Sequence, residues 1–410
     1  MSSHGHSHGV DITEVPPQFR RRLAACAIAL GLLTIVGMAL LWPRQEVSNR
    51  LREFGLGTPT YDARILEVDP ERPCETLDEL VDDFSGSPEG EAETICPAAV
   101  VRLLAGPEKG EQIEIDLPTS GNEGFGRGDR LVLNRDDGGD EVVYSFADRN
   151  RKPMLIGLAL LFATAVVILG RWRGAAALAG LIASMGVLLV FVLPAILDGR
   201  SPVLVAVVGA SAIAFLALYM SHGTGPMTTV ALLGTLASLG VTLLLAVVFT
   251  KLARFSGFVS DEAAIVTLAD GRIDLVGLTL GGIVIGALGA IDDITVTQAS
   301  AVWELRAANP EMSSRDTYRS ALRIGRDHIA STVNTLALAY AGASMPLMLL
   351  FVLSQQSLGS VANGELVATE LVRTLVGSIG LVAAVPVTTA LACLVASRSA
   401  GGPTAASASD

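Results

Sequence analysis

The feature that most constrains this chain is a series of apolar blocks, each about twenty residues long, the length that crosses a hydrocarbon layer of about 30 Å as a helix. Half of the 410 residues are hydrophobic and only 17% are charged. The blocks consist mainly of Leu, Val, Ala and Gly and show no two-residue alternation, which argues against a membrane β-barrel. The chain is therefore predicted to be an α-helical polytopic membrane protein, with the lipid bilayer as its environment.

About eight membrane-spanning helices are expected. Their predicted bounds are Leu23–Trp42, Pro153–Gly170, Ala175–Leu197, Pro202–Met220, Met227–Thr250, Leu275–Trp303, Ile329–Leu353 and Thr374–Ala396. The first block, residues 23–42, lacks the small-x-small pattern of a signal-peptide cleavage site and is interpreted as an uncleaved anchor. Residues 153–396 would then form a seven-helix membrane domain.

Positive charges orient these spans, because cytoplasmic loops carry an excess of Lys and Arg. Most of the arginines in the flanks and loops fall on one side of an eight-span arrangement. These are Arg20, Arg21, Arg22, Arg171, Arg173, Arg306, Arg315, Arg319, Arg323, Arg326 and Arg398. We therefore expect a plasma (inner) membrane protein with both termini in the cytoplasm and residues 43–152 outside it. Residues 1–22 and 397–410 would be disordered cytoplasmic tails.

The segment between the first two spans is strongly acidic. From Arg44 to Lys152 it holds 25 acidic and 13 basic residues, a difference of −12 that equals the formal net charge of the whole chain. Such a charge keeps a domain soluble and disfavours binding to nucleic acid or to anionic lipid.

Five short β-like runs in this segment predict a small barrel of OB type. The runs are Ala63–Val68, Ala98–Leu104, Gln112–Leu117, Arg130–Leu133 and Glu141–Phe146. Cys74 and Cys96 are the only cysteines of the segment, and a disulfide between them is expected in an oxidising compartment. Because no nucleophile–base pair, phosphate loop or metal cluster is apparent, we interpret the domain as a binding or assembly module and expect neither an enzyme nor a cofactor.

The sixth predicted span contains the most informative residues. At about 100° per residue, three glycines share a helical face with a carboxylate and polar side chains. This face carries Gly282, Gly286, Gly289, Asp293, Thr297 and Ser300, with Asp292 on its flank. The glycines are expected to allow close helix packing. A carboxylate inside a span costs several kcal/mol unless it faces a cavity, has a partner or takes up a proton. The alternative interpretation places the pair at the cytoplasmic mouth as ordinary boundary residues.

The next span has an unusually polar cytoplasmic half, which supplies possible partners for the aspartates: His328, Ser331, Thr332, Asn334, Thr335 and Tyr340. Asn334 is predicted as a hydrogen-bonding partner of an aspartate, although helix–helix adhesion is a competing role. Before it, residues 313–328 begin with a capping-box pattern and carry arginines at helical spacing, which predicts an amphipathic helix on the inner membrane surface.

The residues from Gly286 to Leu305, and the segment that follows them to Pro346, resemble the YibE/F family of membrane permeases. This family has no defined substrate, so the resemblance implies topology more than function. The Asp292–Asp293 segment is also similar, more distantly, to resistance–nodulation–division (RND) transporters and to SecD/SecF translocation proteins. That resemblance implies a half-transporter in which the two aspartates carry protons.

The predicted function is a transport or export component that couples to protons or ions through Asp292, Asp293, Asn334 and Thr297. It would act as a homo-oligomer or with a paralogous membrane partner, and its substrate is not defined. One alternative is a non-transporting scaffold or sensor whose external domain binds an envelope protein or ligand. An intramembrane enzyme would have only Asp292, Asp293 and His328 as candidates. His4, His6 and His8 could bind a divalent metal weakly, but a flexible tail without metal explains them as well.

Overall fold

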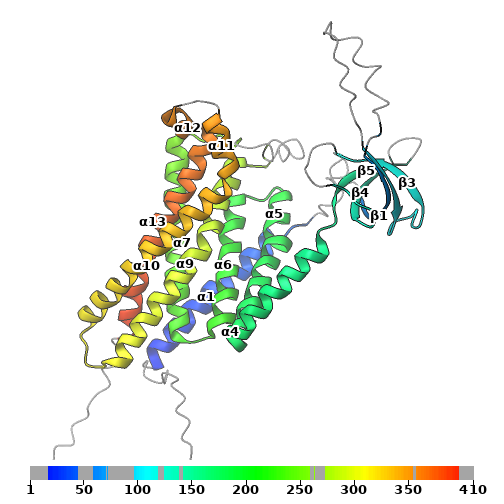
Figure 1. The fold of residues 1–410 in the computed structure, drawn as a ribbon. Coiled ribbons are helices and arrows are strands. Elements are labelled where there is room, and N and C mark those ends of the chain that lie inside the picture. Colours follow the sequence, from blue (N-terminus) through cyan, green and yellow to red (C-terminus); the bar gives the residue numbers. More distant parts are fainter. Residues whose placement is uncertain are drawn as a thin grey trace, which may run out of the picture. The chain divides into compact units, whose positions relative to one another are not determined.

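A computed structural model describes residues 17–44, 59–70, 72, 97–118, 124–137, 142–258, 263, 273–353 and 357–396. The chain divides into two units, which are considered separately (Figure 1). One unit comprises Met1–Val47 and Ala165–Asp410 and is helical, and the other comprises Ser48–Thr164 and contains a β-sheet.

Helices, most of them long, make up most of the described residues. Their bounds are α1 Pro17–Leu41, α4 Lys152–Val187, α5 Leu193–Leu197, α6 Pro202–His222, α7 Pro226–Ala253, α9 Leu275–Ala308, α10 Ser314–Ala343, α11 Met345–Leu353, α12 Leu358–Asn363 and α13 Glu365–Ala396. A π-helical turn, Leu188–Val192, joins α4 to α5. It ends two residues before Pro194, which has no N–H to bond the carbonyl of Val190 and whose ring would clash with that carbonyl in a regular α-helix.

Six helical segments of the described chain are long and apolar enough to cross a membrane, so the predicted count of eight is not confirmed. One of the six, Lys152–Leu197, contains both the second and the third predicted span. Its 46 residues would extend for about 69 Å as a straight helix, twice the thickness of the hydrocarbon layer. The helix is interrupted at Arg171, which has a φ of 51° and a ψ of −133°. Two helices therefore meet at Arg171, and this break lies between the second and the third predicted span, Pro153–Gly170 and Ala175–Leu197.

The predicted span Ile329–Leu353 is also divided differently. The helix α10 ends at Ala343 and α11 begins at Met345, so neither piece alone is long and apolar enough to be counted. Pro346 lies in the first turn of α11, where a proline is tolerated because that N–H has no partner in the helix. The predicted surface helix of residues 313–328 is not separate, because α10 continues through it without a break.

The start of α10 agrees with the sequence. Ser313 is its N-cap, and its hydroxyl oxygen accepts a hydrogen bond from the Asp316 backbone N–H at 3.1 Å. The first half of the helix is amphipathic, with Thr317, Ala321 and Gly325 buried. The four arginines at helical spacing lie on the exposed side: Arg315, Arg319, Arg323 and Arg326.

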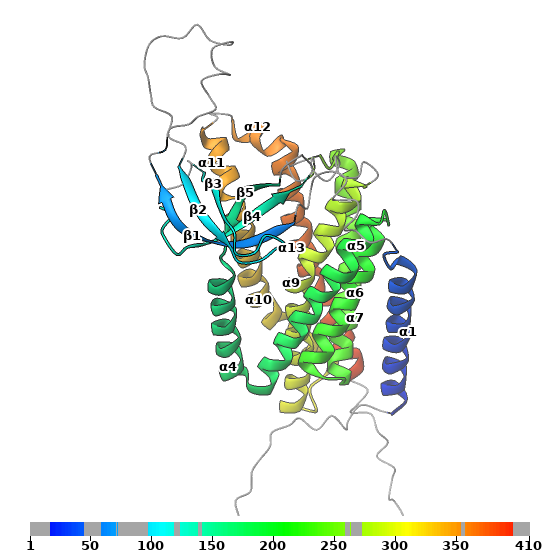
Figure 2. The ribbon, with the colours of Figure 1, turned by 90° about the vertical axis from the view of Figure 1, so that its right-hand side faces the viewer.

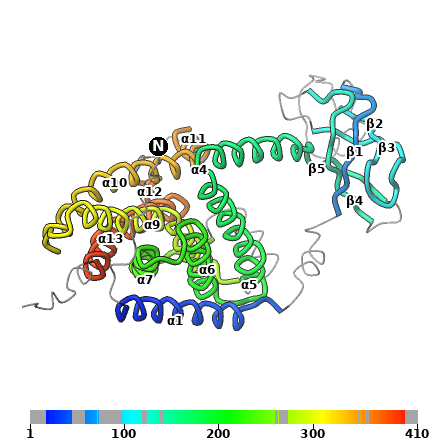
Figure 3. The backbone as a smooth tube through the Cα atoms, turned by 90° about the horizontal axis from the view of Figure 1, so that it is seen from below, coloured from blue at the N-terminus to red at the C-terminus, as the bar shows by residue number. Residues whose placement is uncertain are grey.

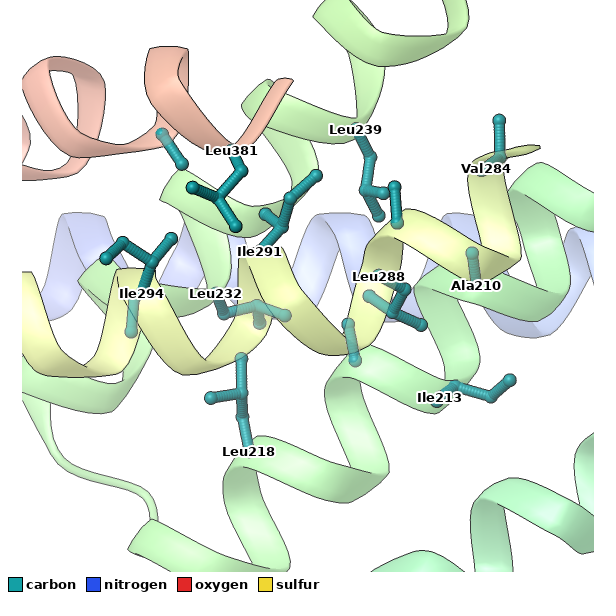
Figure 4. Packing of buried hydrophobic residues seen from close by; sticks show 14 of the residues in the cluster. Ala210, Ile213, Leu218, Leu232, Leu239, Val284, Leu288, Ile291, Ile294 and Leu381 are labelled. Atoms are coloured by element: carbon teal, nitrogen blue, oxygen red, sulfur yellow. The ribbon is translucent and has the colours of Figure 1, made fainter. Parts of the chain in front are cut away.

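Four helices, α6, α7, α9 and α13, form the centre of the helical unit. Figures 1 and 2 show α7, α9 and α13 side by side, and Figure 3 shows α1 along α6 and α7. The buried cluster combines residues from all four helices (Figure 4). It includes Ile213 and Leu218 of α6, Leu232 and Leu239 of α7, Leu288, Ile291 and Ile294 of α9, and Leu381 of α13.

Buried glycines bring these helices together. A Cβ atom on Gly380 of α13 would collide with Thr242 of α7, and one on Gly234 of α7 would collide with Thr388 of α13. On α9, a Cβ atom on Gly281 would lie 3.0 Å from the Cβ of Ala206 on α6. Because lipid tails are as apolar as the side chains, close packing at small residues is a main source of helix association in a membrane.

The smaller unit contains a curled antiparallel sheet with the strand order β3-β2-β1-β4-β5. Its strands are β1 Thr60–Asp69, β2 Ala98–Leu103, β3 Gln112–Asp116, β4 Arg130–Asp136 and β5 Val143–Arg149. All five predicted strands are thus present, with β1 and β4 longer than predicted and β5 displaced towards its C-terminus. Register irregularities at Ile65/Glu67 and Val132/Leu133 help to bend the sheet. Cys74, Cys96 and most of the acidic stretch between β1 and β2 lie outside the described residues.

An ionic cluster joins β4 and β5 to the turn after β2. Arg135 donates to both carboxylate oxygens of Glu108, at 2.9 and 3.3 Å, and the Tyr144 hydroxyl donates to Glu108 Oε2 at 2.6 Å. The hydrogen bond from Arg135, followed by that from Tyr144, lowers the pKa of Glu108 to about 2. Burial, together with the bond to Glu108, raises the pKa of Tyr144 to about 12, so its hydroxyl remains a donor.

This cluster predicts how the stability of the domain depends on pH. The folded-state pKa of Glu108 lies below its ordinary value of 4.5, so ionised Glu108 stabilises the fold above pH 4.5. That stabilisation is lost as the pH falls towards about 2. We expect Glu108→Gln to lower the urea midpoint of the excised domain, residues 43–152, at pH 7, and the difference from wild type to shrink between pH 4.5 and 2. Circular dichroism measures both. Glu111→Gln, an exposed neighbour, is the matched control, and equal midpoints of the two variants at pH 7 would contradict the role of the cluster.

Candidate functional site

Helix α9 positions the acidic pair among the central helices. One side of this helix is buried through Ile291, Ile294, Thr295 and Gln298, all with 0% exposure. Asp292 lies at the edge of this buried side, whereas Asp293 lies on the exposed side. Two adjacent carboxylates in one candidate spanning helix therefore have different surroundings.

Asp293 faces a histidine from α10. Its side chain is 68% exposed, and its Oδ2 atom lies 3.5 Å from Nε2 of His328. This separation allows an ion pair when the imidazole is protonated, although the geometry is not that of a hydrogen bond. His222, at the end of α6, also lies close enough for its imidazole to interact with the charge of Asp293. An imidazole as close to a carboxylate as that of His328 can exchange protons with it, directly or through water.

Asp292 faces α7 instead. The hydroxyl of Thr235 interacts with its carboxyl group, and this hydroxyl also lies 2.7 Å from that of Thr295. Thr295 in turn lies 2.9 Å from the Asp292 backbone oxygen, to which it donates. The Oδ1 atom of Asp292 is buried and has no hydrogen bond in the described part of the chain. Since buried polar atoms almost always have a partner, this oxygen is a natural position for a proton or a water molecule.

The other predicted site residues have different positions. Thr297 donates a hydrogen bond to the backbone oxygen of Asp293 at 2.8 Å and so lies one helical turn from it. Asn334 is exposed on α10, and within the described ranges it forms no hydrogen bond to either aspartate. The structure instead places His328, another of the polar residues at the cytoplasmic end of this predicted span, 3.5 Å from Asp293.

Gly282, Gly286 and Gly289 do lie on the face of Asp293, as predicted. This face is exposed, however, and a Cβ atom on Gly289 would meet nothing within 4 Å. In a single copy of the chain these three glycines are therefore not where the central helices pack most closely. That role belongs to Gly234, Gly281 and Gly380.

Sequence reasoning missed two charged residues on α13. The last span was predicted to begin at Thr374, but α13 begins at Glu365 and thus includes Glu370 and Arg373. Their side chains form an ion pair with an Nη1–Oε1 distance of 2.8 Å. The spacing of three residues between opposite charges at the edge of an apolar block was the available signal.

A kinked set of long apolar helices around a helix that carries two aspartates defines a multi-pass α-helical membrane protein. More specifically, the chain belongs to the YibE/F-like protein family, whose model matches residues 158–398. The matched range contains the acidic pair, His328 and Arg373. No curated protein and no solved structure matches the chain. The resemblance to the YibE/F family is thus confirmed, and the resemblance to RND transporters stays a prediction.

The ionisable side chains near the acidic pair can also be compared with the ligand sets of metal sites. Within the described ranges, no three His, Cys, Asp or Glu side chains come together as a metal ion would require. His4, His6 and His8 lie outside these ranges. Carboxylates with imidazoles and hydroxyls nearby can bind, hold and release a proton.

Proposed function

We propose that this protein is a membrane transport or export component that moves protons, or another monovalent cation, through Asp292 and Asp293. The observation that carries the proposal is the position of Asp293, in a candidate spanning helix, 3.5 Å from His328. An ionisable residue inside a spanning segment typically marks an ion or proton path, because its cost must otherwise be offset by a partner. The buried, unpaired oxygen of Asp292 supports the same function.

The proposal includes a topology and an assembly. Both termini would be in the cytoplasm of the cell, with the protein in the inner membrane and residues 43–152 outside. The external sheet would close as an OB-type barrel, and Cys74 and Cys96 would form a disulfide at the base of the acidic loop. The chain would act as an RND-like half-transporter, together with a second copy or a paralogous partner, and without enzymatic activity. The arginines on the exposed side of α10 support the cytoplasmic assignment of that helix.

Proton movement can be tested directly in liposomes. The full-length protein would be reconstituted with a pH-sensitive dye in the lumen, and a pH step would be imposed with the membrane potential clamped by valinomycin and K⁺. We expect dissipation of the gradient to be faster than in protein-free liposomes. If the two rates agree at several protein-to-lipid ratios, and no Na⁺ or K⁺ flux replaces the proton flux, the proposal is wrong.

A non-transporting scaffold or sensor is the second candidate. Val142 and Val143, at the start of the edge strand β5, are 44% and 59% exposed. An edge strand with exposed apolar side chains is a surface on which a protein ligand can add a strand. This candidate predicts that Asp293→Asn is tolerated in cells and that removal of residues 59–150 is not.

A further inference from the structure

The exposed face of α9 differs from the exposed faces of other long helices. Between Leu275 and Ser300 its exposed residues are Gly282, Gly286, Gly289 and Asp293. In contrast, α1 exposes large side chains such as Leu33 and Leu40, and α4 exposes Leu161 and Leu169. Lipid tails are in contact with large apolar residues in a membrane protein, whereas a carboxylate faces the bundle interior or water. The glycine face of α9, defined by these four residues, is therefore not suited to contact lipid.

Polar groups from α10 and α13 follow this glycine face turn by turn. A Cβ atom on Gly282 would lie 4.0 Å from Nη2 of Arg373, and one on Gly286 would lie 3.1 Å from the Tyr340 hydroxyl. Two turns further, Asp293 faces His328. From Gly282 to Asp293 the helix rises by about 16 Å, roughly half the thickness of the hydrocarbon layer.

The polar group at the far end of the face is the Glu370–Arg373 ion pair. Both side chains are mostly covered, with 29% and 28% exposure, and Nε of Arg373 is buried without a hydrogen bond in the described chain. The charges of both residues reach the hydroxyl of Tyr340. The glycine face thus has the Glu370–Arg373 ion pair at one end and Asp293 with His328 at the other, and the Tyr340 hydroxyl lies beside Gly286 between them.

We propose that Glu370 is a second proton-carrying carboxylate, which exchanges protons with Asp293 through water along the glycine face of α9. This inference rests on the proposed proton movement through the aspartates. Arg373 is the counter-ion of Glu370, and Tyr340 positions the connecting water. The titratable groups around Asp293 are His328 of α10, at 3.5 Å, the neighbouring Asp292 and His222 at the end of α6, which also interacts with the charge of Arg173.

A hydronium ion gives its proton to the Glu370 carboxylate, which leaves water and separates the acid from Arg373. The Glu370 acid then passes a proton to the water chain, and the last water of the chain gives one to the Asp293 carboxylate. Glu370 is again a carboxylate and pairs with Arg373. One proton has moved along the strip, and no electron has been transferred.

The test compares Glu370→Gln with wild type in the liposome assay. We expect proton flux to fall by about 100-fold or more, which is the typical effect of removing a positioned proton-transfer group. Glu311→Gln removes an exposed carboxylate in the loop after α9 and should leave the flux unchanged. Flux that is lost in Asp293→Asn but retained in Glu370→Gln would overturn this inference and leave the proposed function standing. Absence of flux in the wild type would overturn both.

A second measurement does not depend on transport. In a variant whose four native cysteines are replaced by alanine, Gly289→Cys should react with a charged, membrane-impermeant thiol reagent, because the strip contains water. Leu375→Cys, at an exposed apolar position of α13, should react more slowly by about tenfold or more. A large apolar residue on an exposed helix face is suited to contact lipid, and a charged reagent enters lipid only at a high cost in free energy. Equal and slow reaction at both positions would show a dry face and overturn the inference.

Discussion

The variant Asp293→Asn is expected to lose proton flux by about 100-fold or more, because an amide cannot take up and release the proton that a carboxylate carries. The protein should still insert and assemble. Asparagine has nearly the same size as aspartate, and the Asp293 side chain is 68% exposed and so contributes little to packing. The measurement is the dye-loaded liposome assay, with reconstituted protein quantified in every sample.

Asp327→Asn is the matched control for this experiment. Asp327 is exposed on α10 directly beside His328, so the same change of charge and shape is made in the same region without touching Asp293. We expect it to retain wild-type flux. If the two variants conduct protons equally well, Asp293 is not a proton carrier, and the result favours the scaffold interpretation.

The β-domain could be predicted from sequence because its signals are local. Alternating apolar residues fill the inner face of the sheet with Ala63, Ile65, Leu131 and Leu133. Glycines at the turns mark where the strands end, and Gly106 and Gly128 adopt positive φ values of 102° and 98°. A strand and its turn are specified within about ten residues, so pairing partners far along the chain were not needed to find them.

Helical spans were predicted less well because hydropathy does not reveal every break or continuation. The break between the second and the third span could be predicted, because Arg171 and Arg173 interrupt the apolar block where the backbone is non-helical. The break between α10 and α11, at Ser344, is not marked by any charge. Charged residues were assumed to end a span, so the last helix was predicted to begin after Arg373. In the structure Glu370 and Arg373 satisfy each other within α13, and the helix includes both.

The acidic pair could be found from sequence, but its partner could not. Periodicity correctly placed the three glycines and Asp293 on one face of α9. It could not decide which face is inward, because the opposite side is also apolar, with Ile283, Leu288 and Ile291. The partner on α10 depends on how that helix is rotated against α9. Sequence spacing leaves this rotation open, so His328 and Asn334 were equally available.

The second large effect concerns the fold. Gly380→Val should destabilise the helical unit by about 1–3 kcal/mol or more, the usual cost of added volume in a packed core. A Cβ atom there would collide with Thr242 of α7 and would lie 3.6 Å from Ile291 Cδ1 of α9. Thr242 cannot easily move, because it is fully buried and its hydroxyl donates to the Ser238 backbone oxygen at 2.9 Å. We expect a lower yield of monodisperse protein and a lower thermal unfolding midpoint in detergent.

The same substitution on the glycine face of α9 separates packing from function. Gly289→Val adds the same atoms to a helix where a Cβ atom would meet nothing within 4 Å, so the unfolding midpoint should remain close to that of the wild type. If the strip between Glu370 and Asp293 carries water, the valine should nevertheless reduce proton flux by narrowing it. Unfolding midpoints that fall equally in both variants would mean that the glycine face is covered, by a second copy or a partner. A normal midpoint with reduced flux in Gly289→Val would assign this face to proton movement and leave Gly380 to hold α7 and α13 together.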